Sequence, residues 1–284
     1  MVMPHILPQS RAGTPVSPFR EKSEEPTVPE PVRLIQERTA RAVPAETVRR
    51  ADGWWLRDAP AAAWWVRSVL PNADASGERL VCRVEAAEEF YTRRGSLARF
   101  QISPGACPDS LDSLLAERGY RVESPMSLRT ASVARAVDLL GPPPAWVVVD
   151  EHPTRAWFDT WHAVHGGDSR AEWALLERVR CPSGFARAVL GGDVVAVGRA
   201  VVDTGWAGLF GIATLPRARG RGAARAVVAA LAHWAATRHA DHLYLQVERD
   251  NVAACRLYTR AGFRELCGYH YRTAARPPHT GDGP

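Results

Sequence analysis

Lysine is almost absent from this chain of 284 residues: Lys22 is the only one, and nearly all of the 36 Lys plus Arg residues are arginine. The formal net charge of +5 is spread along the chain, and no basic run is interleaved with aromatic residues. This distribution leaves nucleic-acid binding a distant alternative. It favours a solvated surface with local attraction for an anionic ligand.

Paired cysteines and long apolar runs are also missing. The five cysteines include no C-x-x-C pair and the histidines no H-E-x-x-H pattern, so we expect neither a disulfide framework nor a metal site. The sequence contains no run of 18 or more apolar residues, so we predict no membrane-spanning helix. The first residues lack a basic segment followed by an apolar one, so we expect a cytoplasmic protein without a membrane partner.

Prolines divide the chain. The first 44 residues hold eight of the 22 prolines among Glu, Ser and Thr, a composition that cannot bury enough apolar surface to offset the cost of ordering. Gly141 and three successive prolines predict a stiff extended linker. The predicted organisation is a disordered tail (1–44, with 34–41 as the place where an ordered helix or strand can begin), an N-terminal domain (45–140), a linker (141–144), a C-terminal domain (145–275) and a second disordered tail (276–284).

Apolar periodicity predicts an α/β fold class with a mixed central sheet. In the C-terminal domain we expect strands at 146–149, 185–190, 194–202, 208–214, 243–247 and 263–272, and helices at 154–165, 169–180, 221–238 and 251–261. In the N-terminal domain we expect β-type segments at 54–55, 64–66, 97–102 and 120–129, and helices at 85–94 and 110–118. The order helix, strand, helix, strand at the end of the first domain repeats the order at the end of the second.

One strand–turn–helix segment, residues 214–225, indicates an anion site. Gly220 and Gly222 precede an amphipathic helix, whose free N-terminal N–H groups and dipole attract phosphate. The segment has no P-loop lysine, and Arg225 stands where a dinucleotide fingerprint needs Gly or Ala. The charge for a pyrophosphate or 3′-phosphate comes from Arg217, Arg219, Arg221 and Arg225.

Two motifs in this order resemble the GNAT superfamily of N-acetyltransferases. The first is Arg217-x-x-Gly220-x-Gly222, and the second runs from Asn251 through Leu257 and Tyr258 to Phe263. Asn251 and Tyr258 are seven residues apart and so share a helix face. The resemblance implies that acetyl-CoA binds in a gap between strands 208–214 and 243–249. Its binding residues would be Ile212, Ala213, Thr214, Arg217, Arg219, Gly220, Arg221, Gly222, Ala223 and Asn251.

The resemblance also implies catalytic roles. Tyr258 matches the residue that assists the leaving thiolate, while the usual strand carboxylate is missing, since no Asp or Glu occurs between Gly205 and Thr214. Glu248 is the first candidate for a general base, acting through a water, ahead of Asp203 and His162. We expect the acceptor amine to bind against the helices at 154–180, which carry Trp157, Trp161, Asp168, Glu172 and Trp173.

The N-terminal domain has no R-x-x-G-x-G and no match to the second motif. It therefore reads as a degenerate GNAT-like domain in a tandem protein, without a cofactor loop, covering the acceptor side of the catalytic domain. The predicted activity is transfer of an acetyl group from acetyl-CoA to a primary amine of a small molecule or protein, by direct attack in a ternary complex. A non-catalytic acyl-CoA-binding regulatory protein is the alternative, and a homodimer is left open.

Overall fold

The computed structural model describes residues 31–275, and its strands form one mixed sheet. The order across the sheet is β1-β2-β3-β4-β11-β5-β10-β9-β8-β7-β6. Neighbours are antiparallel except for the parallel pairs β3–β4 and β9–β10. The mixed α/β fold class is confirmed. The strands are β1 (Thr47–Ala51), β2 (Trp54–Asp58), β3 (Val69–Leu70), β4 (Arg99–Ile102), β5 (Arg121–Ser132), β6 (Val147–Asp150), β7 (Ser183–Leu190), β8 (Asp193–Asp203), β9 (Trp206–Thr214), β10 (His242–Glu248) and β11 (Arg264–Thr273).

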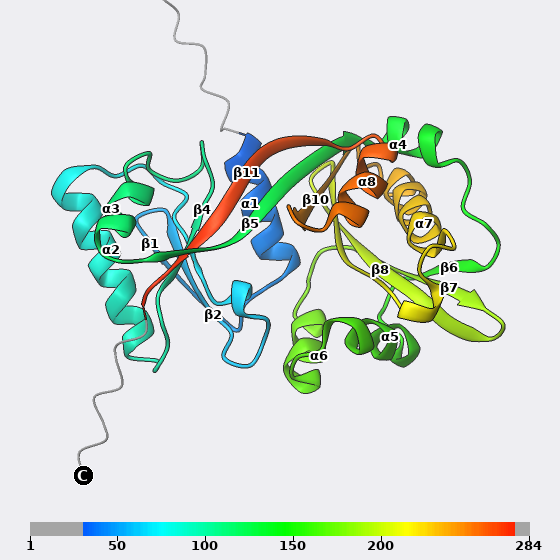
Figure 1. Ribbon diagram of the computed structural model, residues 1–284, viewed down its shortest axis with the longest axis horizontal. Coiled ribbons are helices and arrows are strands. Elements are labelled where there is room, and N and C mark those ends of the chain that lie inside the picture. Colours follow the sequence, from blue (N-terminus) through cyan, green and yellow to red (C-terminus); the bar gives the residue numbers. More distant parts are fainter. Residues whose placement is uncertain (1–30, 276–284) are drawn as a thin grey trace, which may run out of the picture.

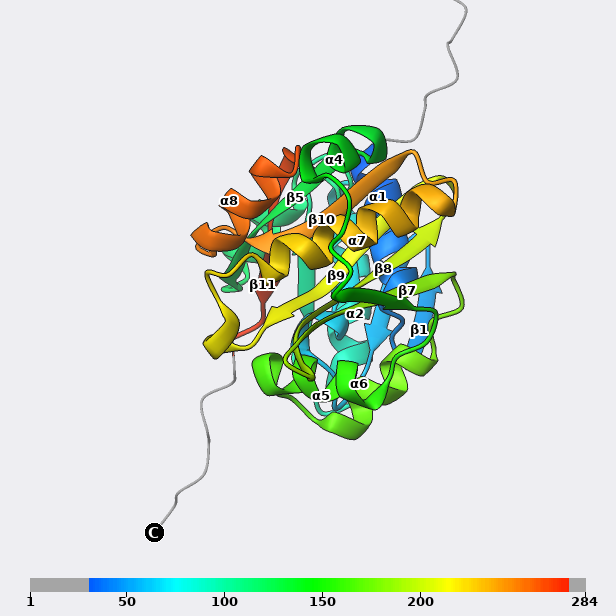
Figure 2. The same ribbon diagram turned by 90° about the vertical axis from the view of Figure 1, so that its right-hand side faces the viewer.

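Helices cover both faces of the sheet, and they fix where the site lies. The long helix α7 packs on β7, β8 and β9 from one face, while α5 packs on the same strands from the other (Figure 2). Alanine makes up much of α7, which favours the helix and lets it approach the sheet closely. The helices are α1 (Pro31–Ala42), α2 (Gly77–Thr92), α3 (Leu111–Glu117), α4 (Val133–Leu140), α5 (Arg155–His165), α6 (Ser169–Glu177), α7 (Ala223–Thr237) and α8 (Val252–Arg260), with 3-10 turns η1 (Trp64–Val66) and η2 (Pro216–Ala218). No helix of the described residues is long and apolar enough to cross a membrane.

Two long strands are exchanged between the halves of the molecule. β11, the last strand of the C-terminal half, lies between β4 and β5 of the N-terminal half. β5 in turn lies between β11 and β10, with register pairs from His242↔Ser132 to Glu248↔Met126. Figure 1 shows β5 and β11 running side by side from one half to the other. The sheet of each half is therefore completed by a strand from the other half.

Helix α1 ties the two halves together and corrects the predicted tail. It lies within the range 1–44 that we assigned to disorder, although it includes the segment 34–41 where order could begin. Its Ile35 packs with Leu128 and Tyr244, and its Gln36 Oε1 accepts a hydrogen bond from Gln246 Nε2 at 2.8 Å. Residues 1–30 and 276–284 of the predicted tails lie outside the described residues.

Most predicted elements are present, with a few differences. The segment at 64–66 is a 3-10 turn instead of a strand, closed by a hydrogen bond from Arg67 N to Trp64 O at 3.2 Å. Sequence periodicity did not predict β1, β3 or α4. Helix α4 matters most, because it packs along α7 and so buries the side of that helix that would otherwise face solvent.

Candidate active site

The parallel pair β9–β10 opens at its C-terminal end. Register pairs run from His242↔Trp206 to Leu245↔Leu209 and stop there, although β9 continues to Thr214 and β10 to Glu248. The two strands therefore separate, as we expected from the resemblance. The backbone N–H and C=O groups that β9 would otherwise pair with β10 are left available to a ligand.

A bulge in β9 marks the point of separation. Across the β8–β9 pair, Arg199 is opposite Phe210 but Val197 is opposite Ala213, so β9 carries one extra residue. Gly211 has φ +58°, and a Cβ built on it would lie 2.9 Å from Trp161 Nε1. Glycine is therefore required at the bulge both by the backbone conformation and by the close approach of α5.

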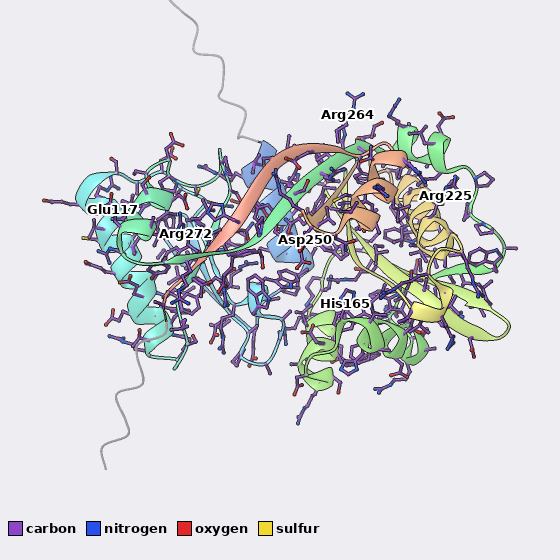
Figure 3. The ribbon with its side chains drawn as sticks, viewed as in Figure 1. Glu117, His165, Arg225, Asp250, Arg264 and Arg272 are labelled. Atoms are coloured by element: carbon purple, nitrogen blue, oxygen red, sulfur yellow. The ribbon has the colours of Figure 1, made fainter. Side chains whose placement is uncertain are left out.

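A cavity of about 1340 Å³ occupies the gap between the separated strands. Its walls include both His165 at the end of α5 and Arg225 in the first turn of α7. Figure 3 labels these two residues on opposite sides of the sheet. The cavity therefore passes through the sheet, with the α7 loop at one end and the helices α5 and α6 at the other.

The α7 end of the cavity has the features of an anion site. Gly222 is the N-cap of α7 with φ +80°, and the first helical bond runs from Ala226 N to Gly222 O, so the N–H groups at 223–225 have no partner within the helix. Thr214 Oγ1 is buried in the same wall and has no hydrogen-bond partner within the described part of the chain. The predicted residues that line this end are Ile212, Thr214, Arg219, Gly220, Gly222 and Ala223. Free donors and an orphaned hydroxyl fit a phosphate-bearing polar ligand.

Three of the predicted cofactor residues do not line the cavity, and Arg225, also predicted to contact phosphate, is already engaged. Arg217 forms an exposed ion pair with Asp193 at 2.8 Å and does not line the cavity. Arg221 is exposed outside the lining, and the side chain of Ala213 is buried in the core between α5 and the sheet. Arg225 lines the cavity, but its Nη2 donates to Leu140 O at 2.8 Å. The side chains of Arg217, Arg221 and Ala213 face away from the cavity because adjacent residues of a turn and of a strand point in different directions.

Helix α8 places the second motif in the wall beside β10. Asn251 Oδ1 accepts a hydrogen bond from Ala254 N at 3.1 Å, which makes it the N-cap of α8. Tyr258 lies two turns further on with 7% of its surface exposed, and its ring packs against Phe263. Both Asn251 and Tyr258 line the cavity. Burial raises the pKa of the Tyr258 phenol to about 12.

Only one of the three base candidates lines the cavity. Glu248, at the end of β10, is an exposed residue in its wall. Asp203 accepts from Arg41 Nε at 2.8 Å outside the lining, and the His162 ring contacts Gly167 O at 3.0 Å. Within residues 31–275, no group of three or more His, Cys, Asp or Glu side chains could hold a metal ion.

The predicted acceptor residues divide into two groups. Trp161 and Glu172 face the cavity, with Glu172 Oε1 accepting from Ala63 N at 2.7 Å. Trp157 also reaches the lining but is a core residue, since its Nε1 donates to Gly198 O at 3.0 Å. The other two serve their own helix: Asp168 caps α6, and Trp173 donates to Glu177.

Much of the acceptor end was not predicted from the sequence. The missed lining residues include Trp64, Trp65, Arg199, Phe210, Gln246, Tyr269 and Tyr271. Several come from η1 and β11, which the strand exchange brings to the site. No local motif marks them, and only the buried charge of Arg199 within an apolar strand was a usable signal.

Known proteins that this chain resembles include N-acetyltransferases. The Acetyltransferase (GNAT) family matches residues 146–263. The chain is 27% identical over 253 residues to the uncharacterized N-acetyltransferase YobR of Bacillus subtilis, covering 85% of this chain and 98% of that protein. Residues 146–263 therefore match the GNAT family of acetyltransferases, and the chain as a whole is similar to a protein named as an N-acetyltransferase.

Solved structures share the fold over both halves. A GCN5-related N-acetyltransferase from Kribbella flavida superimposes with a TM-score of 0.67 at 15% identity, covering 87% of this chain and 96% of that one. A tandem GNAT protein from the clavulanic acid biosynthesis pathway gives a TM-score of 0.56 at 12% identity, covering 85% and 94%. At these identities the likeness concerns the fold alone, and it extends to a tandem arrangement.

Proposed function

We propose that this chain transfers an acetyl group from acetyl-CoA to a primary amine by direct attack in a ternary complex. The observation that carries the proposal is a single cavity that joins the unbonded N-terminus of α7, the open end of the β9–β10 pair and the buried Tyr258. The pyrophosphate would lie at residues 220–223. The pantetheine arm would pair with the free backbone of β9 from Gly211 to Thr214.

The reaction forms a C–N bond and breaks a C–S bond. The amine nitrogen attacks the acetyl carbon, a backbone N–H beside the β9 bulge stabilises the oxyanion, and CoA leaves through its sulfur. Tyr258, with a pKa of about 12, is a weaker acid than a thiol of about 8.5. We therefore assign it a hydrogen bond to the departing sulfur instead of complete proton transfer.

The proton of the attacking amine needs a separate acceptor. We assign this role to Glu248, through a water, because it is the one base candidate of the three that lines the cavity. Its exposed position gives the proton a route to solvent. The N-terminal half contributes no cofactor loop in this proposal, and it closes the acceptor end with α1 and η1.

Donor binding is tested at Gly220, which has φ +74° and nothing within 4 Å of a built Cβ. Asp and Asn both tolerate this conformation and have the same shape, so Gly220→Asp and Gly220→Asn differ only in charge. Isothermal titration should show tight binding of CoA by the wild type, modest weakening in Gly220→Asn and loss in Gly220→Asp. Equal affinity in the two variants would contradict a phosphate at this loop.

The alternative is a non-catalytic acyl-CoA-binding protein, which the absence of a carboxylate on β9 favours. Thiol release from acetyl-CoA over a panel of amines separates the two. CoA released only with an amine present supports the enzyme, whereas binding without turnover on any amine supports the alternative.

A further inference from the structure

Arg199 is a buried cation in the cavity wall, and no residue between 31 and 275 forms an ion pair with it. The residue is 4% exposed and lines the cavity. Its Nη2 donates to Ala42 O at 2.9 Å, at the end of α1, while its Nη1 is buried with no hydrogen-bond partner. Burial lowers the pKa of the guanidinium to about 10, so the group stays charged at neutral pH. A buried charge is costly unless an opposite charge approaches it.

The neighbours of Arg199 leave that position open to a ligand. The guanidinium lies over the Phe210 ring, 5.2 Å from its centroid. Glu172 is the carboxylate whose field reaches Arg199, but the two form no ion pair, and Glu172 Oε1 is held by Ala63 N. Among the described residues, the cation therefore has one backbone carbonyl and one aromatic face, and neither neutralises it.

The position of Arg199 relates it to the chemistry. It pairs in register with Phe210, the residue before the bulge at Gly211 where the proposed thioester lies. Neighbouring strands are about 5 Å apart, so an anion at Arg199 would lie within the length of a small molecule from the bulge. The surrounding wall is aromatic, with Trp65, Tyr269 and Tyr271.

We propose that the acceptor is a small aminocarboxylate, such as an amino acid with an apolar body. Its carboxylate pairs with the Arg199 guanidinium, and its amine faces the open end of β9 and β10. The proposal rests on the proposed function, since it names the substrate class of the same cavity. The aromatic wall covers the apolar body.

The test measures ligand binding and does not depend on turnover. Isothermal titration compares N-acetyl derivatives of glycine, leucine and phenylalanine with their carboxamides, in the presence and absence of CoA. At least one acid should bind tenfold or more tightly than its amide, because the amide leaves the buried cation unpaired. Equal binding of acid and amide throughout the series, or binding of neither, would overturn the proposal.

Variants assign the preference to Arg199. Arg199→Gln should abolish the acid preference, and Arg199→Lys should retain part of it. Arg178→Gln is the matched control, because Arg178 Nε is also buried without a partner but lies outside the cavity, and it should keep the full preference. An unchanged preference in Arg199→Gln would refute the assignment.

A second variant covers the case in which Arg199→Gln does not fold. Glu172→Gln removes the carboxylate whose field competes for Arg199, so acid binding should tighten two- to tenfold, and a loss of acid binding would count against the proposal. If CoA fails to bind, the donor assignment fails, while the acid preference measured without CoA still tests the role of Arg199.

Discussion

Gly211 and Trp161 are packed so closely that no side chain fits between them, since a Cβ at residue 211 would lie 2.9 Å from Trp161 Nε1. The positive φ of Gly211 adds strain for any other residue. The β9 bulge and helix α5 are therefore held in one fixed relation at the entrance to the acceptor end of the cavity.

Gly211→Ala should lower the free energy of unfolding by about 2–3 kcal/mol, combining left-handed strain with overpacking. Gly192→Ala is the control, because Gly192 has φ +88° in the β7–β8 hairpin with open space around a built Cβ, and it should cost only about 1 kcal/mol. Urea denaturation measures both. Equal losses in the free energy of unfolding would show that the Trp161 side chain moves to accommodate the added methyl group.

Tyr258→Phe should lower kcat about 100-fold and leave CoA affinity within about threefold, because the hydroxyl acts on the sulfur only as it departs. The ring keeps its contact with Phe263, so thermal unfolding should change little. Steady-state thiol release with the identified amine measures the rate. A variant with wild-type kcat would remove Tyr258 from the reaction.

The same variant makes a prediction about alkaline pH. The phenol ionises at about 12 in the folded protein and at about 10 in the unfolded chain, so between these values only the unfolded state has released its proton. This contribution to stability is complete below pH 10 and is lost as the pH rises toward 12. Tyr258→Phe should therefore lose stability less steeply than the wild type, by up to about 1.4 kcal/mol per pH unit. Denaturation at pH 9 to 11 measures the slopes, and parallel slopes would contradict a buried phenol.

Arg217 and Arg219, in the loop before α7, should differ in their effect on CoA binding. Arg219 lines the cavity, and Arg219→Gln should weaken CoA binding about tenfold through loss of a charged contact to phosphate. Arg217 is held by Asp193 at the surface, and Arg217→Gln should change the affinity less than about threefold. Isothermal titration at one ionic strength compares them. A larger loss in Arg217→Gln would mean that its ion pair opens when CoA binds.

The strand exchange predicts that the halves do not fold separately. A fragment of residues 145–284 lacks β5 and would leave β10 and β11 without the strand between them. It should aggregate or fail to unfold cooperatively, whereas co-expression with residues 1–144 should restore CoA binding. A monomeric fragment with a cooperative melt would show that β5 is dispensable.

Local features of this protein were predictable, and long-range ones were not. Two glycines before an alanine-rich helix, and an asparagine seven residues before a tyrosine, indicate an anion site and a helix face through short-range geometry alone. The elements of the C-terminal half follow from their apolar periods for the same reason. Side-chain direction within the loop was harder to predict. Arg217, the fixed arginine of the motif, pairs with Asp193 on the neighbouring hairpin, while Arg219, at a variable position of the motif, lines the cavity.

The acceptor end could not be predicted, because it is assembled from distant segments. Trp65 and Tyr271 reach one wall only after β11 has crossed between β4 and β5. Strand partners that are more than a hundred residues apart leave no periodic signal within either segment. Helix α1 was assigned to a disordered tail for a related reason, because its burial depends on Leu128 and Tyr244, which lie far along the chain.

The position of β11 also sets the order in which the protein can be completed during synthesis. β4 and β5 of the N-terminal half are translated well before the strand that separates them, because β11 (Arg264–Thr273) follows the rest of the C-terminal half. Until then the N-terminal half exposes two unfinished strand edges, which invite wrong pairing. Folding should therefore be slow and should finish only once β11 has been made, because its closing contacts join distant parts of the chain.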